Sequence, residues 1–519
     1  MSETLGSLLH NACLRYGDRV ALVGRDGNRT YRQLLERGSR LANGLAGLGL
    51  KPGDHVAALL EDTVTAFEVY FGCALGGFPL VHVNDRLVSR EIDFILEDSE
   101  STVLIHTDGR TPVIDELASL SSMKTVITIG DNLSKGSLNY EKLLEKSSSI
   151  TPPDTRKPED LAILGYTSGT TGFPKGSMSS HRAVVGCIKL IPFAYRLPMY
   201  GRCAFTGTLS FVSGIWGVIL PHLYTGGTVS FLAPYTVETW VDHMINNKST
   251  FTYAPSPLVP GFIEEVGRRR DALTHLETVL HSASPLPPAH AQALVELIGE
   301  RYVEVWGMTE TVAPLTVTAR EDWRGVTRAD DIFSSVGRPL MTASIRVVDS
   351  QRRPVASGET GELVVSADTM FSGYYNRPDK TSEVLVNGEY FTGDIGRIDA
   401  AGYIYVTDRA TDMIITGGMN VYPAEVEAYL AQLTQIAEVA VVGTPDAKWG
   451  ETVTAVVVLK NGQTISQEDI LRHVKTGLAS YKKPTQIVFA ESLPRNAGMK
   501  VQKHILKASL KASLKEGKL

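Results

Sequence analysis

The chain has 519 residues, of which 43% are hydrophobic and 21% are charged, and its formal net charge at pH 7 is −6. These values are typical of a globular protein with more than one domain and argue against a disordered or fibrous chain. The slightly acidic balance, without a dense basic block, also argues against nucleic acid as a partner, because binding to phosphate backbones requires clustered Lys and Arg.

The N-terminal segment and the cysteines predict a cytoplasmic protein without a stable membrane span. Leu5, Leu8 and Leu9 repeat on one face of an amphipathic helix and do not form the continuous apolar core of a signal peptide. The longest apolar stretch, near Phe211–Leu220, is too short to cross a bilayer and is followed by Pro221. The chain has four cysteines and no Cys-x-x-Cys pair, so neither a disulfide framework nor a zinc site is indicated.

Alternating strand and helix patterns in the first part of the chain predict an α/β fold. Strand-like runs such as Val56–Leu60 and Thr102–Ile105 alternate with helical patterns such as Ile92–Leu96 and Ala289–Ile298. Such alternation favours a large domain in which helices and a sheet form layers.

The segment Tyr166–Gly176 reads YTSGTTGFPKG and follows the buried-strand pattern Leu161–Leu164. Glycines allow backbone N–H groups to turn toward an anion, hydroxyls add hydrogen-bond donors, and Lys175 supplies a positive charge. We interpret the segment as a loop that binds the phosphates of a nucleoside triphosphate. It is not a Walker A loop, because Pro174 replaces the second glycine and Gly176 stands where Ser or Thr is required. The alternative is a flexible Ser/Thr/Gly linker.

The pattern changes twice toward the C-terminus. Between Glu359 and Tyr405, short strands separated by Asn-Gly and Ala-Gly turns predict a small β-rich subdomain. Further on, Pro423 is suited to the first position of a helix that we expect to reach Leu433. A compact α+β unit of about a hundred residues is expected there. Its other predicted elements are the strands Val439–Val442, Val453–Leu459 and Ile487–Phe489 and the helix Glu468–Ala479.

A series of short motifs resembles the adenylate-forming enzymes. This family includes acyl-CoA synthetases, the adenylation domains of peptide synthetases and the beetle luciferases, and the resemblance covers nearly the whole chain. Besides the phosphate loop, the matching motifs are Trp306–Glu310, Val336–Pro339, Gly358–Leu363, Tyr390–Asp394, Asp408–Arg409, Gly417–Glu427 and Pro494–Lys500. One motif alone could mislead, but the ordered series is highly specific.

The resemblance implies a reaction that uses ATP, Mg²⁺ and coenzyme A. A carboxylic acid is first joined to AMP with release of pyrophosphate, and the acyl group then passes to the thiol of coenzyme A. Because charge moves between phosphate oxygens in the first step, cations and preorganised donors are needed there. The resemblance assigns Lys500 to the attacking carboxylate and the α-phosphate, Thr309 to the α-phosphate and Glu310 to Mg²⁺.

The nucleoside end of the nucleotide is assigned in the same way. The resemblance places Asp394 at the ribose hydroxyls, supported by Arg409. Taken alone, these two residues would more often form a surface ion pair, and Lys500 would be a loose tail lysine. The full set implied to bind ATP or AMP is Thr167, Ser168, Gly169, Thr170, Thr171, Gly172, Lys175, Ala283, Ser284, Pro285, Trp306, Gly307, Met308, Asp394 and Arg409.

The resemblance also implies two domains that move between the two steps. Residues 1–408 would form the N-terminal adenylation domain, with the acid pocket and the ATP site. Residues 409–519 would form a small mobile C-terminal domain that carries the catalytic Lys500 and gives access to the thiol. Arg409 and Thr411 mark the hinge, where relatives often have Lys or Asp at the second position.

Gly417 and Gly418 would line the entry for the pantetheine arm, since a narrow tunnel leaves no room for a side chain and allows the backbone to contact the arm. The alternative is an ordinary turn. Two further segments depart from the family pattern. Met499 separates Gly498 from the lysine, and the Gly-rich adenine segment appears as His281–Pro287, with Ala and Ser in place of Gly.

The acid itself is predicted from the segment around Phe211. Val212 stands where relatives that activate amino acids carry Asp, and it cannot pair with an ammonium group, which argues against an α-amino acid. Together with Ile215, Trp216 and Val312, it suggests an apolar pocket for an aryl, alicyclic or medium-chain acyl acid. These side chains could equally belong to the core.

The resemblance also indicates which molecule accepts the acyl group. No Gly-Gly-x-Ser carrier motif follows the C-terminal unit, so free coenzyme A is the expected acceptor, with a separate acyl carrier protein as a second option. Two alternatives stay open: an adenylating enzyme that passes the acyl group to another nucleophile, and a catalytically silent paralogue that only binds nucleotide. The sequence also leaves open whether the chain forms a homodimer.

Overall fold

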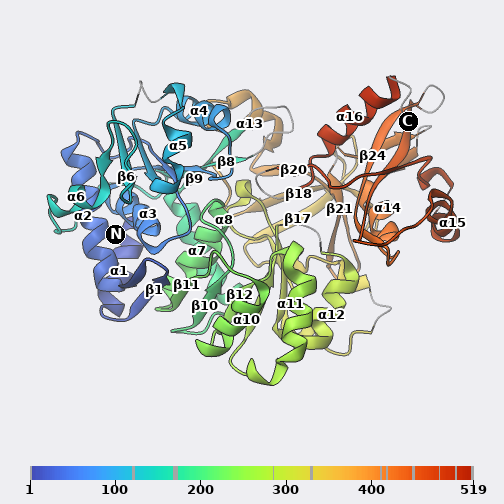
Figure 1. The fold of residues 1–519 in the computed structure, drawn as a ribbon, viewed down its shortest axis with the longest axis horizontal. Coiled ribbons are helices and arrows are strands. Elements are labelled where there is room, and N and C mark those ends of the chain that lie inside the picture. The colour runs from blue at the N-terminus through green and yellow to red at the C-terminus, as the bar shows by residue number, and fades with distance from the viewer. Residues whose placement is uncertain are drawn as a thin grey trace. The chain divides into compact units, whose positions relative to one another are not determined.

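The computed structural model describes residues 3–119, 123–167, 174–283, 286–327, 331–409, 412–416, 419–446, 450–478, 480–496 and 500–515. The chain separates into two compact units (Figure 1). The first contains Met1–Ser344 and Ser366–Tyr390, and the second contains Ile345–Val365 and Phe391–Leu519. The expected division into an adenylation domain of residues 1–408 and a mobile domain of residues 409–519 stays a prediction.

A seven-stranded sheet forms one half of the first unit. Its strands are parallel except for the last pair, and their order is β7-β6-β5-β3-β4-β8-β9. Side chains of β3 point alternately into two apolar clusters, one on each face of the sheet, which explains its continuous apolar run. The strands are β3 (Val56–Leu59), β4 (Leu80–Val83), β5 (Val103–Thr107), β6 (Thr125–Ile129), β7 (Leu138–Asn139), β8 (Leu161–Thr167) and β9 (Lys175–Ser180).

A nine-stranded sheet forms the other half of the first unit, in the order β16-β15-β14-β13-β12-β10-β11-β1-β2. Its central strands from β1 to β14 are parallel. β2 pairs antiparallel with β1 on one side, and on the other side β15 pairs antiparallel with both β14 and β16. The strands are β1 (Val20–Gly24), β2 (Gly27–Thr30), β10 (Arg202–Phe205), β11 (Thr228–Phe231), β12 (Phe251–Tyr253), β13 (Thr278–His281), β14 (Tyr302–Trp306), β15 (Thr316–Val317) and β16 (Arg338–Pro339). Two parallel sheets with helices between the strands confirm the predicted layered α/β fold.

Helices of the first unit pack closely where glycines allow it. A Cβ atom on Gly72 of α3 would lie 2.4 Å from Cδ2 of Leu41 on α2, so only glycine permits this helix contact. Helices α10, α11 and α12 pack side by side (green to yellow in Figure 1). The helices are α1 (Leu5–Tyr16), α2 (Tyr31–Gly47), α3 (Val64–Gly76), α4 (Ser89–Asp98), α5 (Thr111–Ile114), α6 (Tyr140–Glu145), α7 (His181–Ala194), α8 (Val212–Gly214), α9 (Leu220–Tyr224), α10 (Val237–Asn246), α11 (Val259–Arg268), α12 (Pro288–Ile298) and α13 (Pro378–Val384).

Short helical turns supplement these helices. Ile215–Ile219 forms the π-helical turn η3 between α8 and α9. The 3-10 turns are η1 (Asp108–Arg110), η4 (Ser256–Leu258), η5 (Arg270–Ala272), η6 (Gly299–Arg301), η7 (Thr309–Thr311), η8 (Arg320–Trp323), η9 (Asp331–Ser334) and η10 (Ser480–Lys482).

A five-stranded sheet corresponds to the predicted β-rich subdomain. Its order is β17-β18-β20-β19, and β21 pairs with β20. Asn387 and Gly388 both have positive φ, +53° and +79°, and connect β19 to β20 as the Asn-Gly pattern predicts. The strands are β17 (Ala343–Val348), β18 (Gly361–Ala367), β19 (Leu385–Val386), β20 (Glu389–Ile398) and β21 (Ile404–Arg409).

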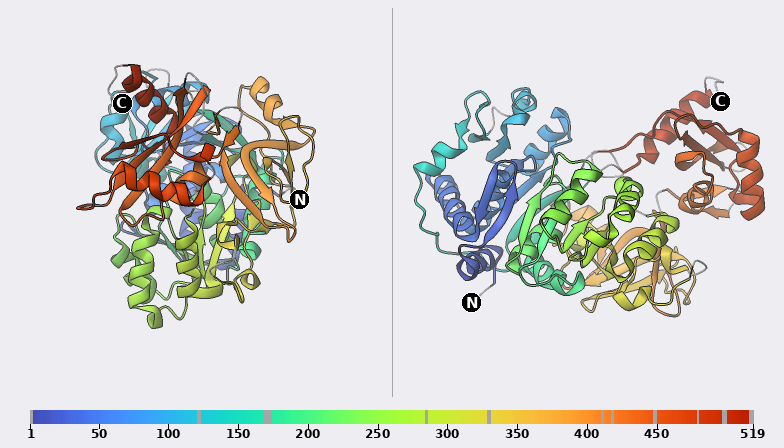
Figure 2. Two further views of the ribbon diagram at one scale, coloured as in Figure 1. Left: turned by 90° about the vertical axis from the view of Figure 1, so that its right-hand side faces the viewer. Right: turned by 60° about the horizontal axis from the view of Figure 1, so that its bottom comes forward.

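The C-terminal part is the α+β fold that the sequence predicts. A sheet of order β23-β22-β25-β24, with β26 on β25, carries helices, and α16 packs on β24 through Leu506 and Leu510 (red in Figures 1 and 2). Pro423 is the first residue of its helix, as expected. The elements are β22 (Ile414–Thr416), β23 (Met419–Val421), α14 (Pro423–Leu430), β24 (Ile436–Asp446), β25 (Gly450–Leu459), α15 (Gln467–Gly477), β26 (Gln486–Phe489) and α16 (Lys503–Lys515).

Some boundaries differ from the prediction. Helix α14 ends at Leu430, three residues earlier than expected, and β24 is considerably longer than Val439–Val442. The long strand is stabilised by continuous antiparallel pairing with β25, which local apolar patterns do not indicate. In the ranges that the structure describes, none of the helices combines the length and apolar character that a membrane crossing requires.

Candidate active site

The predicted phosphate loop connects two paired strands of the seven-stranded sheet. Strand β8 ends at Thr167, β9 begins at Lys175, and these two residues face each other in the antiparallel pairing. The hairpin therefore fixes both ends of the loop, and Lys175 is half-buried at its C-terminal end. The predicted phosphate contacts that lie outside the described residues are Ser168, Gly169, Thr170, Thr171 and Gly172.

A buried carboxylate, a tyrosine hydroxyl and an ammonium group form a connected set beside this hairpin. Glu310 is 8% exposed, and its Oε1 accepts a hydrogen bond of 2.8 Å from the hydroxyl of Tyr374. Nζ of Lys175 lies 4.9 Å from the centre of the same tyrosine ring, within the range of a cation–π contact. Tyr374 thus contacts both charged groups and holds an anion and a cation close to one another.

The end of β14 places Glu310 in this position. The strand ends at Trp306, which is buried, and Gly307 makes a turn in which a Cβ atom would lie 2.9 Å from Cα of Pro314. Only glycine fits such a close backbone approach. The N–H of Met308 then donates to Oγ1 of Thr311 at 3.2 Å and begins the turn η7. In this turn Thr309 is half-buried and Glu310 is buried.

Tyr374 is held by backbone hydrogen bonds along β9. The N–H of Met178 donates to the carbonyl of Gly373 at 3.0 Å, and the N–H of Tyr375 donates to that of Gly176 at 2.8 Å. Tyr374 does not belong to any of the motifs recognised in the sequence. The aromatic run at this place was the only available signal, and it gives no indication of a contact with Glu310, 64 positions away along the chain.

Gly165 is a second residue near the site that lies outside the sequence motifs. A Cβ atom there would lie 3.2 Å from Cγ2 of Thr309 and 3.5 Å from both methyl groups of Val212. Strand β8, turn η7 and helix α8 therefore meet at one glycine. This contact brings the predicted α-phosphate ligand next to the predicted acid pocket.

The predicted acid-pocket residues lie together in the first unit. Phe211 is half-buried at the start of α8, whereas four others are buried in one apolar cluster. Sγ of Cys187 lies 3.7 Å from the carbonyl oxygens of two of them and links their backbones. Their assignment to the acid pocket stays a prediction. The four residues are Val212, Ile215, Trp216 and Val312.

Two residues in predicted site segments have a left-handed backbone. Val312 has φ +59°, which is a genuine outlier for a β-branched residue, and Ala283 has φ +74°. Such backbone strain concentrates at functional sites. The value at Ala283, whose side chain is exposed, is one that glycine adopts without strain. Ser284 and Pro285, the other predicted residues of the segment, lie outside the described residues.

Two aspartates hold the segment that precedes the predicted acid pocket. Asp62 accepts a hydrogen bond from the N–H of Leu209, and Asp85 accepts one from the hydroxyl of Ser210. The hydroxyl of Tyr70 donates to the carbonyl of Leu209 at 3.4 Å. Burial raises the pKa of the Asp62 carboxyl from its ordinary 3.8 to about 6.

We expect Asp62→Asn to stabilise the protein at neutral pH. Because the folded-state pKa is raised, the fold favours the protonated Asp62 carboxyl. The contribution of this carboxyl to stability is complete below about pH 4 and is lost as pH rises through about 6. The variant stays neutral and keeps an acceptor for Leu209. Its advantage in unfolding free energy should grow from near zero at pH 4 to roughly 3 kcal/mol at pH 7, measured by urea unfolding. A difference that does not change with pH would contradict the assignment.

In the second unit, the predicted ribose ligand lies on β20. Asp394 is 4% exposed, and its N–H donates to Oγ1 of Thr392 at 3.0 Å. It lies directly opposite Arg409 in the pairing of β20 with β21. The backbone register therefore makes these two predicted ribose contacts neighbours.

The predicted catalytic lysine lies at the end of a closed loop. The N–H of Lys500 donates to Oδ1 of Asn496 at 3.0 Å, and its carbonyl accepts from the N–H of Asn496 at 2.9 Å. Lys500 is exposed. The loop thus presents it on the surface of its own unit. Thr411, Gly417 and Gly418, the predicted hinge and thiol-entry residues, lie outside the described residues.

Glu310 is a buried carboxylate that is available for the metal ion. Within the ranges that the structure describes, no three His, Cys, Asp or Glu side chains gather closely enough to bind a metal by themselves. Mg²⁺ usually binds through one or two carboxylates together with substrate phosphates and water, so Glu310 fits the requirement. The ion would therefore arrive with the nucleotide.

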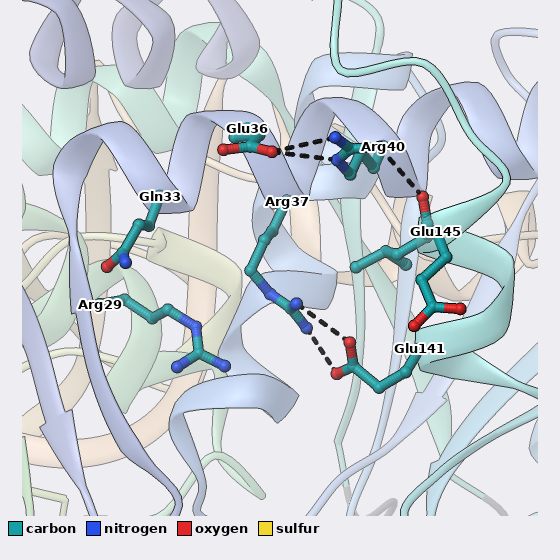
Figure 3. Close-up of a pocket in the computed structure, with 8 residues that line it drawn as sticks. Arg29, Gln33, Glu36, Arg37, Arg40, Glu141 and Glu145 are labelled. Atoms are coloured by element: carbon teal, nitrogen blue, oxygen red, sulfur yellow. Dashed lines mark hydrogen bonds and ion pairs between the residues drawn. The ribbon is translucent and has the colours of Figure 1, made fainter.

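A pocket of about 570 Å³ lies elsewhere in the first unit, between α2 and α6 (Figure 3). Arg37 points at Glu141 and makes hydrogen bonds of 2.6 and 3.0 Å to its two oxygens, and Arg40 pairs with Glu36. These carboxylates already occupy the guanidinium groups. The pocket is lined by Arg29, Gln33, Glu36, Arg37, Arg40, Glu141, Leu144 and Glu145, which include none of the predicted site residues.

Comparisons with known proteins identify the family of the chain. The family model described as AMP-binding enzyme matches residues 9–375, and the one described as AMP-binding enzyme C-terminal domain matches residues 425–500. The chain is 32% identical to a feruloyl-CoA synthase from Amycolatopsis sp over 91% of this chain and 92% of that protein. It is 31% identical to a fatty acid–[acyl-carrier-protein] ligase from Streptomyces coeruleorubidus, over 92% and 91%.

A solved structure extends the similarity to the fold. The anthranilate CoA ligase in complex with anthranoyl-AMP superposes with a TM-score of 0.90 at 25% identity, over 99% of this chain and 98% of that one. The match spans both compact units.

Proposed function

The chain belongs to the AMP-binding enzyme family, and we propose that it joins a non-amino carboxylic acid to coenzyme A through an acyl-adenylate. As an enzyme it is an acid–thiol ligase of the AMP-forming type. The observation that carries the proposal is the contact set of Glu310, Tyr374 and Lys175 at the end of the phosphate-loop hairpin. It offers a carboxylate for Mg²⁺ and an ammonium group for phosphate in one place.

The residues act by charge and position during adenylation. The loop from Thr167 to Lys175 binds the phosphates, and Thr309 contacts the α-phosphate, next to the acid. Mg²⁺, when bound with ATP at Glu310, would neutralise the charge on the phosphates. Lys500 bridges the acid carboxylate and the α-phosphate while the bond to phosphorus forms. Preorganised charges of this kind are most effective in a site from which water is excluded.

The proposed acid is a non-amino aryl, alicyclic or medium-chain acyl acid. Val212, at the position next to Gly165, offers no charge to an ammonium group, and its neighbours in the cluster are apolar. Burying an unpaired ammonium among such residues would be costly. The named substrate of the related feruloyl-CoA synthase supports an aryl acid.

Coenzyme A is the proposed acceptor, and an acyl carrier protein is the second candidate. The relative named as a fatty acid–[acyl-carrier-protein] ligase supports this second candidate. A cytoplasmic location stays a prediction, and the oligomeric state is left open.

A screen of carboxylic acids tests the proposal. Each acid is mixed with the enzyme, ATP and Mg²⁺, and pyrophosphate release is measured with and without coenzyme A, followed by detection of thioester. We expect release with aryl or medium-chain acids and thioester only when coenzyme A is present. Release with hydroxamate trapping but no thioester would favour the carrier protein or another nucleophile. No exchange between ATP and pyrophosphate with any acid would leave only the nucleotide-binding paralogue.

We expect Gly418→Trp to block thioester formation and preserve adenylation. An indole at the proposed thiol entry would fill the space that the pantetheine arm requires, while the acid and ATP sites stay intact. Thioester yield should fall by about two orders of magnitude, the size of loss that a 1 Å misplacement of reactants can cause. Pyrophosphate exchange, measured in the same preparation, is the control. Thioester yield equal to that of the unmodified protein would exclude the proposed entry.

A further inference from the structure

Three side chains, two on neighbouring strands and one in the turn η4, form a hydrogen-bonded relay. Nε2 of His281 lies 2.7 Å from Oγ of Ser256, and Nδ1 lies 2.8 and 2.9 Å from the two carboxylate oxygens of Glu304. The order is hydroxyl, imidazole, carboxylate. This is the geometry of an activated nucleophile, in which a base contacts the hydroxyl and a third group orients the base.

The topology of the nine-stranded sheet brings the three together. Strands β12, β13 and β14 are parallel neighbours, and His281 faces Glu304 in the register of β13 with β14. Ser256 lies three residues beyond the end of β12, where the chain turns into η4 and α11. His281 is the last residue of β13 and Ser256 follows the end of β12, so these two residues lie at the edge where open α/β sheets bind ligands, whereas Glu304 is the third residue of β14.

The hydrogen bonds define the tautomer of the imidazole. An ionised carboxylate only accepts hydrogen bonds, so Nδ1 of His281 carries the proton that it donates to Glu304. When the ring carries this proton alone, Nε2 is the acceptor for the hydroxyl of Ser256. The hydroxyl of Tyr302 also donates to Glu304, and the backbone N–H of Glu304 donates to Oγ1 of Thr318 at 2.9 Å. These contacts hold the carboxylate in the orientation that the ring requires.

The three residues of the relay differ in how far they are exposed to solvent. His281 is fully buried, Glu304 is 7% exposed, and Ser256 is half-buried. The base and the carboxylate are therefore shielded from water, and the serine is the most exposed residue of the three. A purely structural network would not require this gradient.

We propose that Ser256, His281 and Glu304 form a catalytic relay that hydrolyses activated acyl esters and thioesters. Oγ of Ser256 bonds to the acyl carbonyl carbon, its proton passes to Nε2 of His281, and the bond to the leaving oxygen or sulfur breaks as the leaving group takes that proton. Water then attacks the acyl-serine ester and gives its proton to Nε2. The bond to Oγ breaks, Oγ takes the proton back, and the carboxylic acid leaves. The activity goes beyond the proposed ligase and needs neither ATP nor Mg²⁺.

The experiment uses the full chain without ATP or coenzyme A. Hydrolysis of p-nitrophenyl acetate is followed by absorbance, and a fluorophosphonate probe is used to label the nucleophile, located by peptide mass spectrometry. We expect the label on Ser256 and at least a tenfold loss of hydrolysis in Ser256→Ala. Ser249→Ala, a serine two residues before β12, is the matched control and should retain the activity. A second arm with acetyl-CoA and a thiol reagent extends the assignment to thioesters when thiol is released.

A second variant separates the relay from a structural role. Glu304→Gln keeps the size and hydrogen-bonding capacity of the side chain but allows the wrong imidazole tautomer, so hydrolysis should fall at least tenfold while the unfolding temperature changes little. A label on another serine, or hydrolysis unchanged in both Ser256→Ala and Glu304→Gln, would overturn the proposal. Adenylation is measured separately by pyrophosphate exchange, so failure of the relay and failure of the ligase assignment are distinguished.

Discussion

Lys500→Ala should reduce acid-dependent pyrophosphate release by a factor of about 10³ while largely sparing thioester formation from supplied acyl-adenylate. During adenylation, negative charge shifts between the carboxylate and the α-phosphate, and a preorganised cation at that place stabilises the transition state. Loss of one such donor typically costs two to three orders of magnitude. Thioester formation involves a thiol and a carbonyl and does not need this ammonium group.

Lys511→Ala is the matched control for this prediction. Lys511 is also exposed and lies on α16, so its loss removes the same charge from the same unit. Both half reactions should be unchanged in that variant. Equal loss of both half reactions in Lys500→Ala would show that the lysine supports the fold of its loop and does not act on the substrates.

Local patterns in the sequence predicted those parts of the fold that are stabilised by neighbours along the chain. Pro423 begins its helix because its fixed φ suits that position, and Asn387 and Gly388 form their turn because both tolerate positive φ. The apolar run of β3 reflects burial on both faces. Each of these signals is contained within a few consecutive residues.

Contacts between distant segments could not be predicted in the same way. Tyr374 reaches Glu310 because backbone bonds along β9 carry it there, and Gly165 matters only through its contacts with Thr309 and Val212. Neither the structural propensity of Tyr374 nor the spacing of a local motif indicates that its partner is Glu310, 64 positions away. The sequence motifs identified Glu310 and Thr309 through resemblance, but the residues that position them became visible only in three dimensions.

The predicted acid pocket shows a further limit of apolar patterns. Ile215 and Trp216 lie in the π-helical turn η3 and are fully buried, which suits either the wall of a closed pocket or the core. Apolar residues give the same sequence signal in both roles, since burial alone produces it. Π-helical turns are often found at functional sites, which supports the pocket. The hydrogen bonds of Asp62 and Asp85 to the preceding segment support it as well, because they fix the place where the turn begins.

Glu310→Gln should reduce pyrophosphate release by about 10² to 10³ and weaken the response to Mg²⁺. The amide keeps the size of the side chain and can still accept the hydrogen bond from Tyr374, so the fold should be preserved. It lacks the negative charge that Mg²⁺ requires in its oxygen ligands. The concentration of Mg²⁺ for half-maximal rate should therefore rise severalfold, measured by pyrophosphate release at fixed ATP.

A pair of tyrosine variants locates the effect at this carboxylate. Tyr374→Phe removes the hydroxyl that orients Glu310. A hydrogen bond to a charged group contributes about 1.5 to 3 kcal/mol, so its loss corresponds to a rate loss of roughly tenfold to a hundredfold. Tyr375→Phe is the matched control, because its hydroxyl bonds to Glu100, outside the proposed site, and the rate should be unchanged. If Glu310→Gln kept both the rate and the Mg²⁺ response, the ion would have to be held by phosphates and other residues, and the contact between Tyr374 and Glu310 would serve the fold alone.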